Sequence, residues 1–265
     1  MDLGLDGKRA IVTGGSRGIG KAVARTLATE GCDVVVAARH EGPLAEAAAT
    51  LSAETGRRVE PVTVDTGDDE SVRAMVAGAV DVLGGVDILV NSAAAPLGQS
   101  APPKLADVTQ ELFWADMNVK VLGYLRCAQA VAPHMAAAGW GRIVNISGLG
   151  ARTTGAVIGS MRNVAVAALA KNLADELGPL GINVTVVHPG LTRTEATPGV
   201  IARTAEARGI SPEEAERSLV RNSIGHLVDA AEVADVVAFL ASPRSIAITG
   251  DAIACGGGHP GAIYY

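Results

Sequence analysis

Residues 13–20 read TGGSRGIG, and their glycines Gly14, Gly18 and Gly20 stand between an apolar run and an Ala-rich stretch. Glycine lets the backbone approach a ligand closely, and the free N–H groups and positive dipole of a helix N-terminus attract phosphate. This spacing therefore favours the binding of a phosphorylated ligand. Glycine-rich turns also serve plain packing of a strand on a helix, so the segment alone leaves both interpretations open.

The elements that would position this loop follow from the hydrophobic pattern. Short runs rich in Val and Ile alternate with Ala-rich stretches of helical spacing. The runs are 9–14, 33–39, 59–65, 86–93, 141–147 and 182–190, and the helical stretches include 21–30, 44–54, 70–83 and 164–177. Strands that are apolar throughout and alternate with helices predict a parallel sheet covered on both faces. The sequence thus predicts a doubly wound α/β fold.

The chain shows no linker, repeat or composition break, which predicts a single domain over residues 1–265. Its least regular part is 191–228. Within it, Ser211 and Pro212 precede two acids, a pattern that predicts a helix capped by Ser211. Insertions beyond the carboxyl ends of strands cover the ligand crevice in open α/β sheets. We interpret 191–228 as a substrate lid, with an ordinary surface excursion as the alternative.

Composition argues against several classes of function. Hydrophobic residues make up 48% and charged residues 19%, as in globular proteins. Lys and Arg total 22 against 28 Asp and Glu, and aromatic residues only 3%, which argues against a nucleic-acid partner. No apolar run approaches the roughly 18 residues that span a bilayer, so we expect no membrane partner and a cytoplasmic protein. The scattered cysteines and histidines have no metal-site spacing, so we expect no metal.

Six segments resemble, in order, motifs of the short-chain dehydrogenase/reductase (SDR) family. They are the glycine loop 13–20 with its TGxxxGIG spacing, Val64–Asp65, Asn91–Ala94, Asn118, 188–194 and 248–258. The resemblance covers nearly the whole chain. It implies a Rossmann-type domain that binds NAD or NADP and a small-molecule substrate. It also implies a homodimer or homotetramer built on helices near 107–137 and 158–177. For cofactor binding it implies Gly14, Ser16, Arg17, Gly18, Ile19, Gly20, Arg39, Asp65, Thr66, Asn91, Ala93, Pro189, Gly190, Thr192 and Thr194.

The charge near the second strand favours one cofactor over the other. An NAD site of this type carries an acid at the end of that strand for the ribose 2′-OH, whereas a 2′-phosphate needs a cation. Here Ala38 occupies that position, Arg39 follows it, and Arg17 lies inside the glycine loop. The sequence therefore favours NADP, with NAD as the alternative if Arg39 is only a surface residue.

The resemblance implies a catalytic Tyr and a Lys four residues later, together with a Ser and an Asn. A gap-free match of 159–177 to the family's helix places Gly159 at the Tyr position and Asn163 at the Lys position. Ser147 is the candidate serine, although the family more often has it one residue later, where Gly148 stands. Asn118 is the only residue of the set that matches without ambiguity.

Other residues could supply the missing proton donor. Arg162 could stabilise an oxyanion or bind an acidic substrate, and His188 has the ordinary pKa for acid–base work, with a histidine satisfied by backbone as the alternative. Tyr124 lies about 240° around a helix from Asn118, which indicates a packing residue, and Tyr264 and Tyr265 could fold over the crevice. None of the five lysines, Lys8, Lys21, Lys104, Lys120 and Lys171, matches the required position.

Three hypotheses remain. The first is an oxidoreductase with a rearranged acid, built from Ser147 with Asn118, Arg162 or His188. The second is a catalytically silent cofactor-binding protein or the inactive partner of an active homologue, which the loss of both Tyr and Lys favours. The third, a lyase or isomerase on the same scaffold, has no residue signature. Carbonyl reduction needs a proton or strong hydrogen bonds at the oxygen, so the first two differ in whether the site supplies them.

Overall fold

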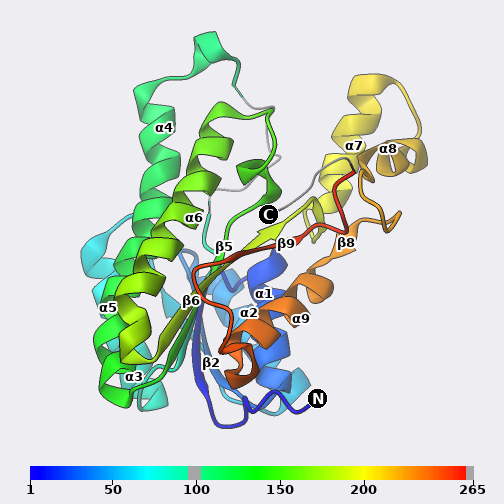
Figure 1. The fold of residues 1–265 in the computed structure, drawn as a ribbon. Helices are drawn as coiled ribbons and strands as arrows, with labels where there is room; N and C mark the ends of the chain where they lie inside the picture. Colours follow the sequence, from blue (N-terminus) through cyan, green and yellow to red (C-terminus); the bar gives the residue numbers. More distant parts are fainter. Residues whose placement is uncertain (95–102, 261–265) are drawn as a thin grey trace.

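Seven parallel strands form the central sheet of the computed structural model, which describes residues 1–94 and 103–260 (Figure 1). Their order is β3-β2-β1-β4-β5-β6-β9. All six predicted strands form, and β9 extends the sheet beyond β6, so the predicted doubly wound fold is confirmed. The strands are β1 Arg9–Thr13, β2 Asp33–Ala38, β3 Val59–Thr63, β4 Ile88–Asn91, β5 Gly141–Ile146, β6 Ile182–Pro189 and β9 Ala252–Cys255.

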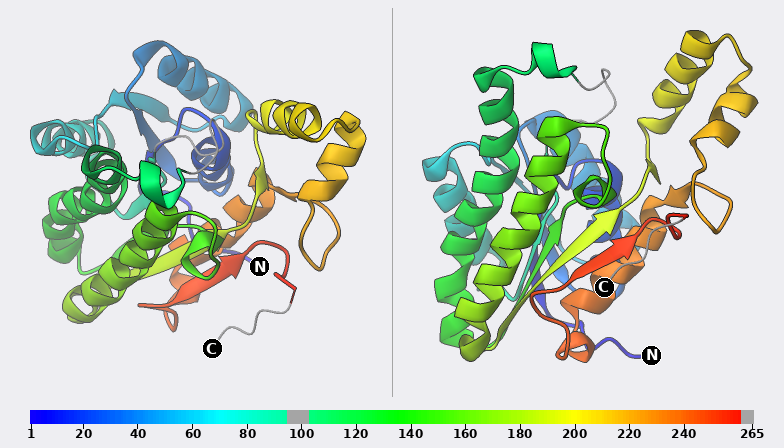
Figure 2. Two further views of the ribbon diagram at one scale, coloured as in Figure 1. Left: turned by 90° about the horizontal axis from the view of Figure 1, so that it is seen from above. Right: turned by 45° about the horizontal axis from the view of Figure 1, so that its top comes forward.

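Helices cover both faces of this sheet (Figure 2). One layer holds α1 Gly18–Thr29, α2 Glu41–Thr55 and α9 Ala230–Ala241; the other holds α3 Asp69–Leu83, α5 Gly123–Ala138 and α6 Val157–Leu177. The strand sequences explain both contacts. In β2, Val34 and Val36 face the first layer while Val35 and Ala37 face the second, because side chains alternate along a strand. Two buried cores therefore fix the sheet between its helices.

The long helix predicted near 107–137 is interrupted. It consists of α4 Gln110–Met117, a π-helical turn Asn118–Leu122, and α5. A π turn holds one more residue than an α turn, and such turns are frequent at functional sites. The residues around position 120 therefore face other directions than an ideal 100° step per residue predicts.

The segment 191–228 contains β7 Thr192–Arg193, α7 Thr197–Arg208, α8 Pro212–Leu219 and the first residue of β8 Val228–Asp229. The helices α7 and α8 stand away from the sheet, beyond the carboxyl ends of the strands (Figure 1). Ser211 caps α8 in a capping box with Glu214, which confirms the predicted cap. Across the described ranges, no helix has the length and apolarity to cross a membrane.

Candidate active site

The glycine loop lies at the carboxyl end of β1, and two of its glycines, Gly14 and Gly20, leave no space for side chains. Gly14 has a φ of +70°, and a Cβ there would lie 2.9 Å from the backbone nitrogen of Ala93. A Cβ on Gly20 would collide with the carbonyl oxygen of Gly14. The backbone of the loop is therefore bare and tightly turned, as a close approach to a phosphorylated ligand requires.

An anionic group already lies at the start of α1. The N–H of Gly18 donates to Oε2 of Glu195 at 2.9 Å, and Thr194 packs beside it, with Cγ2 3.6 Å from the position of a Gly18 Cβ. Free N–H groups and the helix dipole favour negative charge at this end of a helix. The carboxylate stands in for an anion such as a phosphate, so the loop fits the phosphate groups of a dinucleotide.

Most of the predicted cofactor residues gather at the same edge of the sheet. Thr13 Oγ1, at the end of β1, accepts from the N–H groups of Ser92 and Ala93, while Asn91 donates from Nδ2 to Asn145 Oδ1 at 2.9 Å. The remaining ones lie on the glycine loop, after β3, or along the β6–β7 connection; they are Ser16, Ile19, Asp65, Thr66, Pro189, Gly190 and Thr192.

Two arginines flank the glycine loop on its exposed side. Arg17 lies within the loop and Arg39 follows β2, and both side chains are exposed. Neither has an ion-pair partner among the residues that the structure describes. Two free guanidinium groups beside a phosphate-binding loop can hold a further phosphate.

On the other side of the edge, Ser147, Asn163 and Lys120 form one buried cluster. Lys120 Nζ donates to the carbonyl oxygen of Ser147 at 3.0 Å and to Oδ1 of Asn163 at 3.2 Å. The Ser147 hydroxyl donates to the backbone carbonyl of Asn163 at 3.0 Å. Only 3% of Lys120 is exposed. Lys120, which does not match the family's Lys position, thus contacts Asn163, which does.

Asn118 does not join this cluster. Its Nδ2 donates to the Gly67 carbonyl at 3.0 Å, and its Oδ1 accepts from Arg126 at 2.9 Å. Both amide atoms are thus engaged at the turn after β3. The π turn directs Lys120, rather than Asn118, toward the end of β5. A lysine flanked by Val119 and Val121 in an apolar helix was the sequence signal for a buried amine.

His188 lies at the end of β6, where its Nδ1 accepts from the Gly148 N–H at 3.4 Å. Burial and the positive charges of Arg152 and Lys120 lower the pKa of His188 to about 4. The ring is therefore neutral near pH 7, with its proton on Nε2, and is a poor proton donor. The alternative interpretation, a histidine satisfied by backbone, agrees with this hydrogen bond.

Arg162 and Tyr124 both have internal partners. Arg162 is 1% exposed, and its Nη1 lies 2.5 Å from Oδ1 of Asp116 on α4. The Tyr124 hydroxyl donates to the Ile146 carbonyl at 2.9 Å, and burial raises the pKa of this phenol well above its usual value. Tyr124 is a packing residue, as predicted, while the Arg162 guanidinium is directed to α4. Tyr264 and Tyr265 lie outside the described residues.

Glycines lie against the Asn163 amide and one turn before it in α6. Among the described residues, a Cβ on Gly159 would meet the Ala156 side chain alone within 4 Å. Nδ2 of Asn163 would lie 3.1 Å from a Cβ on either Gly148 or Gly150, so side chains there would crowd the amide. Glycine at positions 148 and 150 therefore leaves room for the Asn163 amide.

A pocket of about 320 Å³ lies between the turn after β5, the end of β6 and the segment 191–228. It is lined by Leu149, Thr153, Gly190, Leu191, Leu219, Arg221, Asn222, Leu227, Gly256 and His259. Residues of the strand ends and residues beyond α8 thus share one hollow, which is of a size to hold a small molecule.

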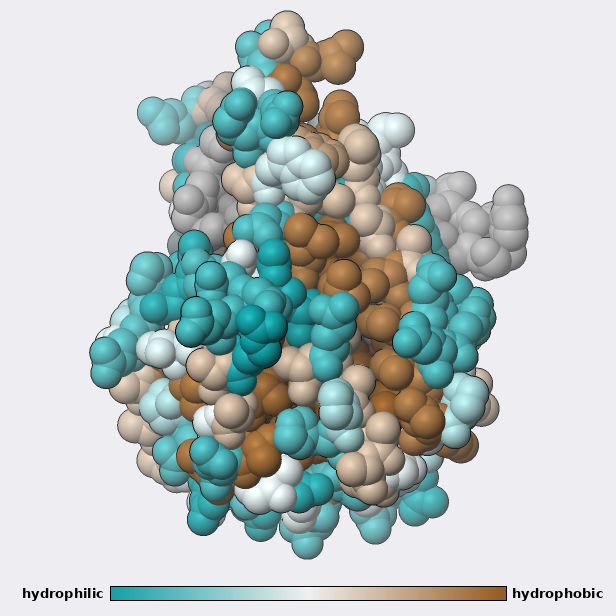
Figure 3. Space-filling model, turned by 90° about the vertical axis from the view of Figure 1, so that its left-hand side faces the viewer, coloured by the Kyte–Doolittle hydropathy of each residue, from teal (hydrophilic) through white to brown (hydrophobic). Residues whose placement is uncertain are grey.

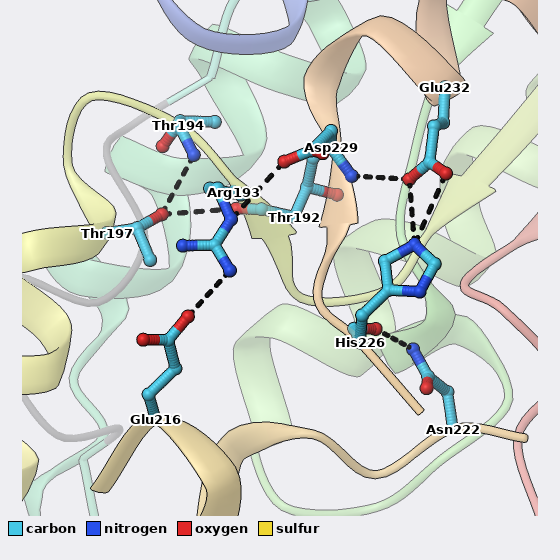
Figure 4. A network of polar contacts seen from close by, with 9 residues as sticks. All are labelled: Thr192, Arg193, Thr194, Thr197, Glu216, Asn222, His226, Asp229 and Glu232. Atoms are coloured by element: carbon cyan, nitrogen blue, oxygen red, sulfur yellow. Dashed lines mark hydrogen bonds and ion pairs between the residues drawn. The ribbon is translucent and has the colours of Figure 1, made fainter. Parts of the chain in front are cut away.

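Ion pairs fix the base of the segment 191–228 (Figure 4). Arg193 contacts Glu216 of α8 at 2.6 Å and Asp229 at 3.3 Å. His226 Nε2 lies 3.2 Å from Oε1 of Glu232, and Oε2 of the same carboxylate accepts from the Asp229 N–H. Exposed pairs of this kind are each weak, so together they orient the segment more than they stabilise the fold.

The buried amine makes stability depend on pH. Burial, assisted by Arg162, lowers the Lys120 pKa from 10.5 to about 7. Between these values the unfolded chain binds a proton that the folded chain lacks, so this group makes the unfolding free energy rise with pH. Lys120→Met removes that contribution. We expect its stability relative to the unmodified protein to be greatest near pH 7 and to decline toward pH 10, measured by urea unfolding.

Lys171→Met is the matched control, because Lys171 is exposed on α6 and pairs with Asp175. Its stability difference from the unmodified protein should show no such slope over this window. A constant difference for Lys120→Met as well would contradict a buried Lys120 with a lowered pKa.

Comparison with known proteins places the chain in a family. Residues 14–259 match the family model described as enoyl-(acyl carrier protein) reductase. The chain is 33% identical to the short-chain reductase protein NovJ of Streptomyces niveus, over 95% of this chain and 93% of that protein. It is also 33% identical to the 3-oxoacyl-[acyl-carrier-protein] reductase FabG of Vibrio cholerae, over 97% and 98%. L-Sorbose reductase from Gluconobacter frateurii, solved with NADPH and L-sorbose, superposes with a TM-score of 0.93 at 30% identity, covering 99% and 100% of the two chains. The chain therefore belongs to the short-chain dehydrogenase/reductase family.

Proposed function

We propose that this chain is an NADP(H)-dependent oxidoreductase that interconverts a carbonyl and an alcohol in a small molecule, with a rearranged catalytic site. The observation that carries the proposal is the bare glycine loop whose Gly18 N–H already holds a carboxylate. The solved L-sorbose reductase, similar over almost its whole length, contains NADPH.

In the proposed NADP site, different residues contact the pyrophosphate, the 2′-phosphate and the nicotinamide. Gly14, Gly18 and Gly20 would hold the pyrophosphate, and Arg17 and Arg39 would hold the 2′-phosphate of NADP. Thr194 and Pro189 lie on the connection that packs against Gly18 and would border the nicotinamide. Bound NADPH would supply the hydride that becomes the new C–H bond of the alcohol.

The substrate half rests on the pocket and the segment beside it. We propose that 191–228 is the lid of a single domain, because Leu219, Arg221 and Asn222 line the pocket together with Leu149 and Gly190. Ser147 and Asn163 would face the reacting oxygen. We propose that Gly159 and Asn163 stand at the usual Tyr and Lys positions, so that the acid comes from another residue.

We further propose that copies of the chain associate through α4, α5 and α6. Exposed apolar side chains lie on α4 and α6, including Leu112, Trp114, Met161 and Val164. A hydrophobic band crosses the face shown in Figure 3, on the side where α4 and α5 lie in Figure 1. Apolar surface of this kind indicates a protein interface, and here the occupant would be a second copy.

The test of the proposed function is a fluorescence titration with NADPH and NADH, followed by turnover assays over a panel of ketones, aldehydes and alcohols. We expect micromolar NADPH binding, weaker NADH binding, and NADPH-linked reduction of at least one carbonyl. Binding without any turnover would instead favour a silent cofactor-binding protein. Binding of neither nucleotide would contradict the cofactor assignment.

The choice of NADP can be tested at Arg39. A charge-assisted hydrogen bond contributes about 1.5–3 kcal/mol, so Arg39→Ala should weaken NADPH binding about tenfold or more. NADH binding should hardly change, because NADH lacks the 2′-phosphate. Arg73→Ala is the control, since Arg73 is exposed on α3 and pairs with Asp69. Equal losses for NADPH and NADH in Arg39→Ala would contradict the assignment.

A further inference from the structure

The hydrogen bonds of the buried cluster determine the orientation of its groups. An ammonium group only donates, so the Asn163 atom that faces Lys120 Nζ must be the carbonyl oxygen, Oδ1. The Asn163 Nδ2 group is consequently directed away from Lys120, toward the backbone of Gly148 and Gly150. No described residue accepts a hydrogen bond from Nδ2.

Two of the three N–H groups of Lys120 Nζ have acceptors among the described residues. Of its three N–H groups, one is directed to the Ser147 carbonyl and one to Asn163 Oδ1. Within residues 1–94 and 103–260, no acceptor engages the third. Burying an amine so completely costs folding free energy unless all of its hydrogen bonds are made. An amine kept in this position at that cost indicates a functional role. A methionine would fill the same volume without that cost.

We propose that Lys120 is the general acid and base of this site, and that Asn163 both holds Nζ of Lys120 through Oδ1 and contacts the reacting oxygen through Nδ2. This assignment rests on the proposed oxidoreductase function and names the proton donor that function requires. It places the acid on the π turn between α4 and α5, and not on α6, where the resemblance to the family leads one to expect it.

The proposed step balances in atoms and charge. In reduction, the hydride forms the new C–H bond, and the π electron pair of the carbonyl moves to oxygen. That oxygen takes a proton from Lys120: an O–H bond forms, the Nζ–H bond breaks, and neutral amine remains, to be reprotonated from solvent. In alcohol oxidation the neutral amine accepts the proton. Asn163 Nδ2 donates a hydrogen bond to the same oxygen and stabilises its developing negative charge.

The surroundings suit an amine that changes protonation near neutral pH. Arg162 on α6 and burial favour the neutral form, and the carboxylate of Asp116 on α4 favours the charged form; together they bring the Lys120 pKa to about 7. His188 on β6 is neutral at this pH, because its own pKa lies at about 4. A catalytic acid works best when its pKa is near the operating pH. Lys120 meets that condition. Lys171 is exposed, pairs with Asp175 and lies outside the buried cluster.

The experiment measures both proton binding and turnover. Protein with ¹³C-labelled lysine side chains gives five ε-carbon signals, and Lys120→Met identifies one of them by its loss. We expect that signal to titrate near pH 7 in the unmodified protein. Asn163→Asp puts a carboxylate beside Nζ, so the titration should move to higher pH. A signal that titrates at the ordinary value of a lysine would overturn the assignment.

Turnover supplies the second readout. We expect Lys120→Met to lower NADPH-linked reduction about 100-fold or more while it still binds NADPH, since removal of a general acid typically costs this much. In the unmodified protein, reduction should decline as pH rises through about 7, and in Asn163→Asp that decline should shift to higher pH. Lys171→Met should behave like the unmodified protein.

The outcomes separate this assignment from the proposed function. If the unmodified protein reduces a carbonyl and Lys120→Met does so equally well, the function stands and the assignment is overturned. If the unmodified protein binds NADPH but reduces nothing, the function itself is overturned, and the acid role falls with it.

Discussion

Parallel pairing of β1, β4, β5 and β6 is the constraint on which the other features of this protein depend. Because these strands run in one direction, their carboxyl ends share one edge of the sheet. Residues far apart in sequence, such as Gly18, Ser147 and Pro189, are thereby delivered to the same edge. The two apolar cores on either face keep the edge rigid, and so a cofactor and a substrate can be held in a fixed relation.

At this edge of the sheet, the buried Lys120 and the glycines beside Asn163 shape the candidate site. The glycines at 148 and 150 leave room for the Asn163 amide, and Lys120 on the π turn donates a hydrogen bond to its Oδ1. Arg162 and Asp116 pair behind the lysine and adjust how readily it holds its proton. The glycines thus make room for the Asn163 amide, and Arg162 and Asp116 set the pKa of Lys120.

Much of the fold could be predicted because hydrophobic periodicity reports directly on burial. The six apolar runs became strands, and the Ser211 cap followed from side-chain chemistry at a helix start. Lys120 was missed for a physical reason: a π turn adds a residue that an ideal helix lacks, which changes the direction of the side chains around it. Motif matching placed Asn118 in the site, but hydrogen bonds to Gly67 and Arg126 direct its side chain elsewhere. Pairings between residues distant in sequence, such as Glu195 with Gly18, have no local signature.

The most direct measurement is a crystal structure of this protein with NADP⁺ and an alcohol bound. The account predicts that Lys120 Nζ keeps its contacts with Ser147 and Asn163 and that its third N–H lies within hydrogen-bond distance of the alcohol oxygen. An alcohol oxygen bonded to other groups, with Lys120 Nζ out of its reach, would contradict the account.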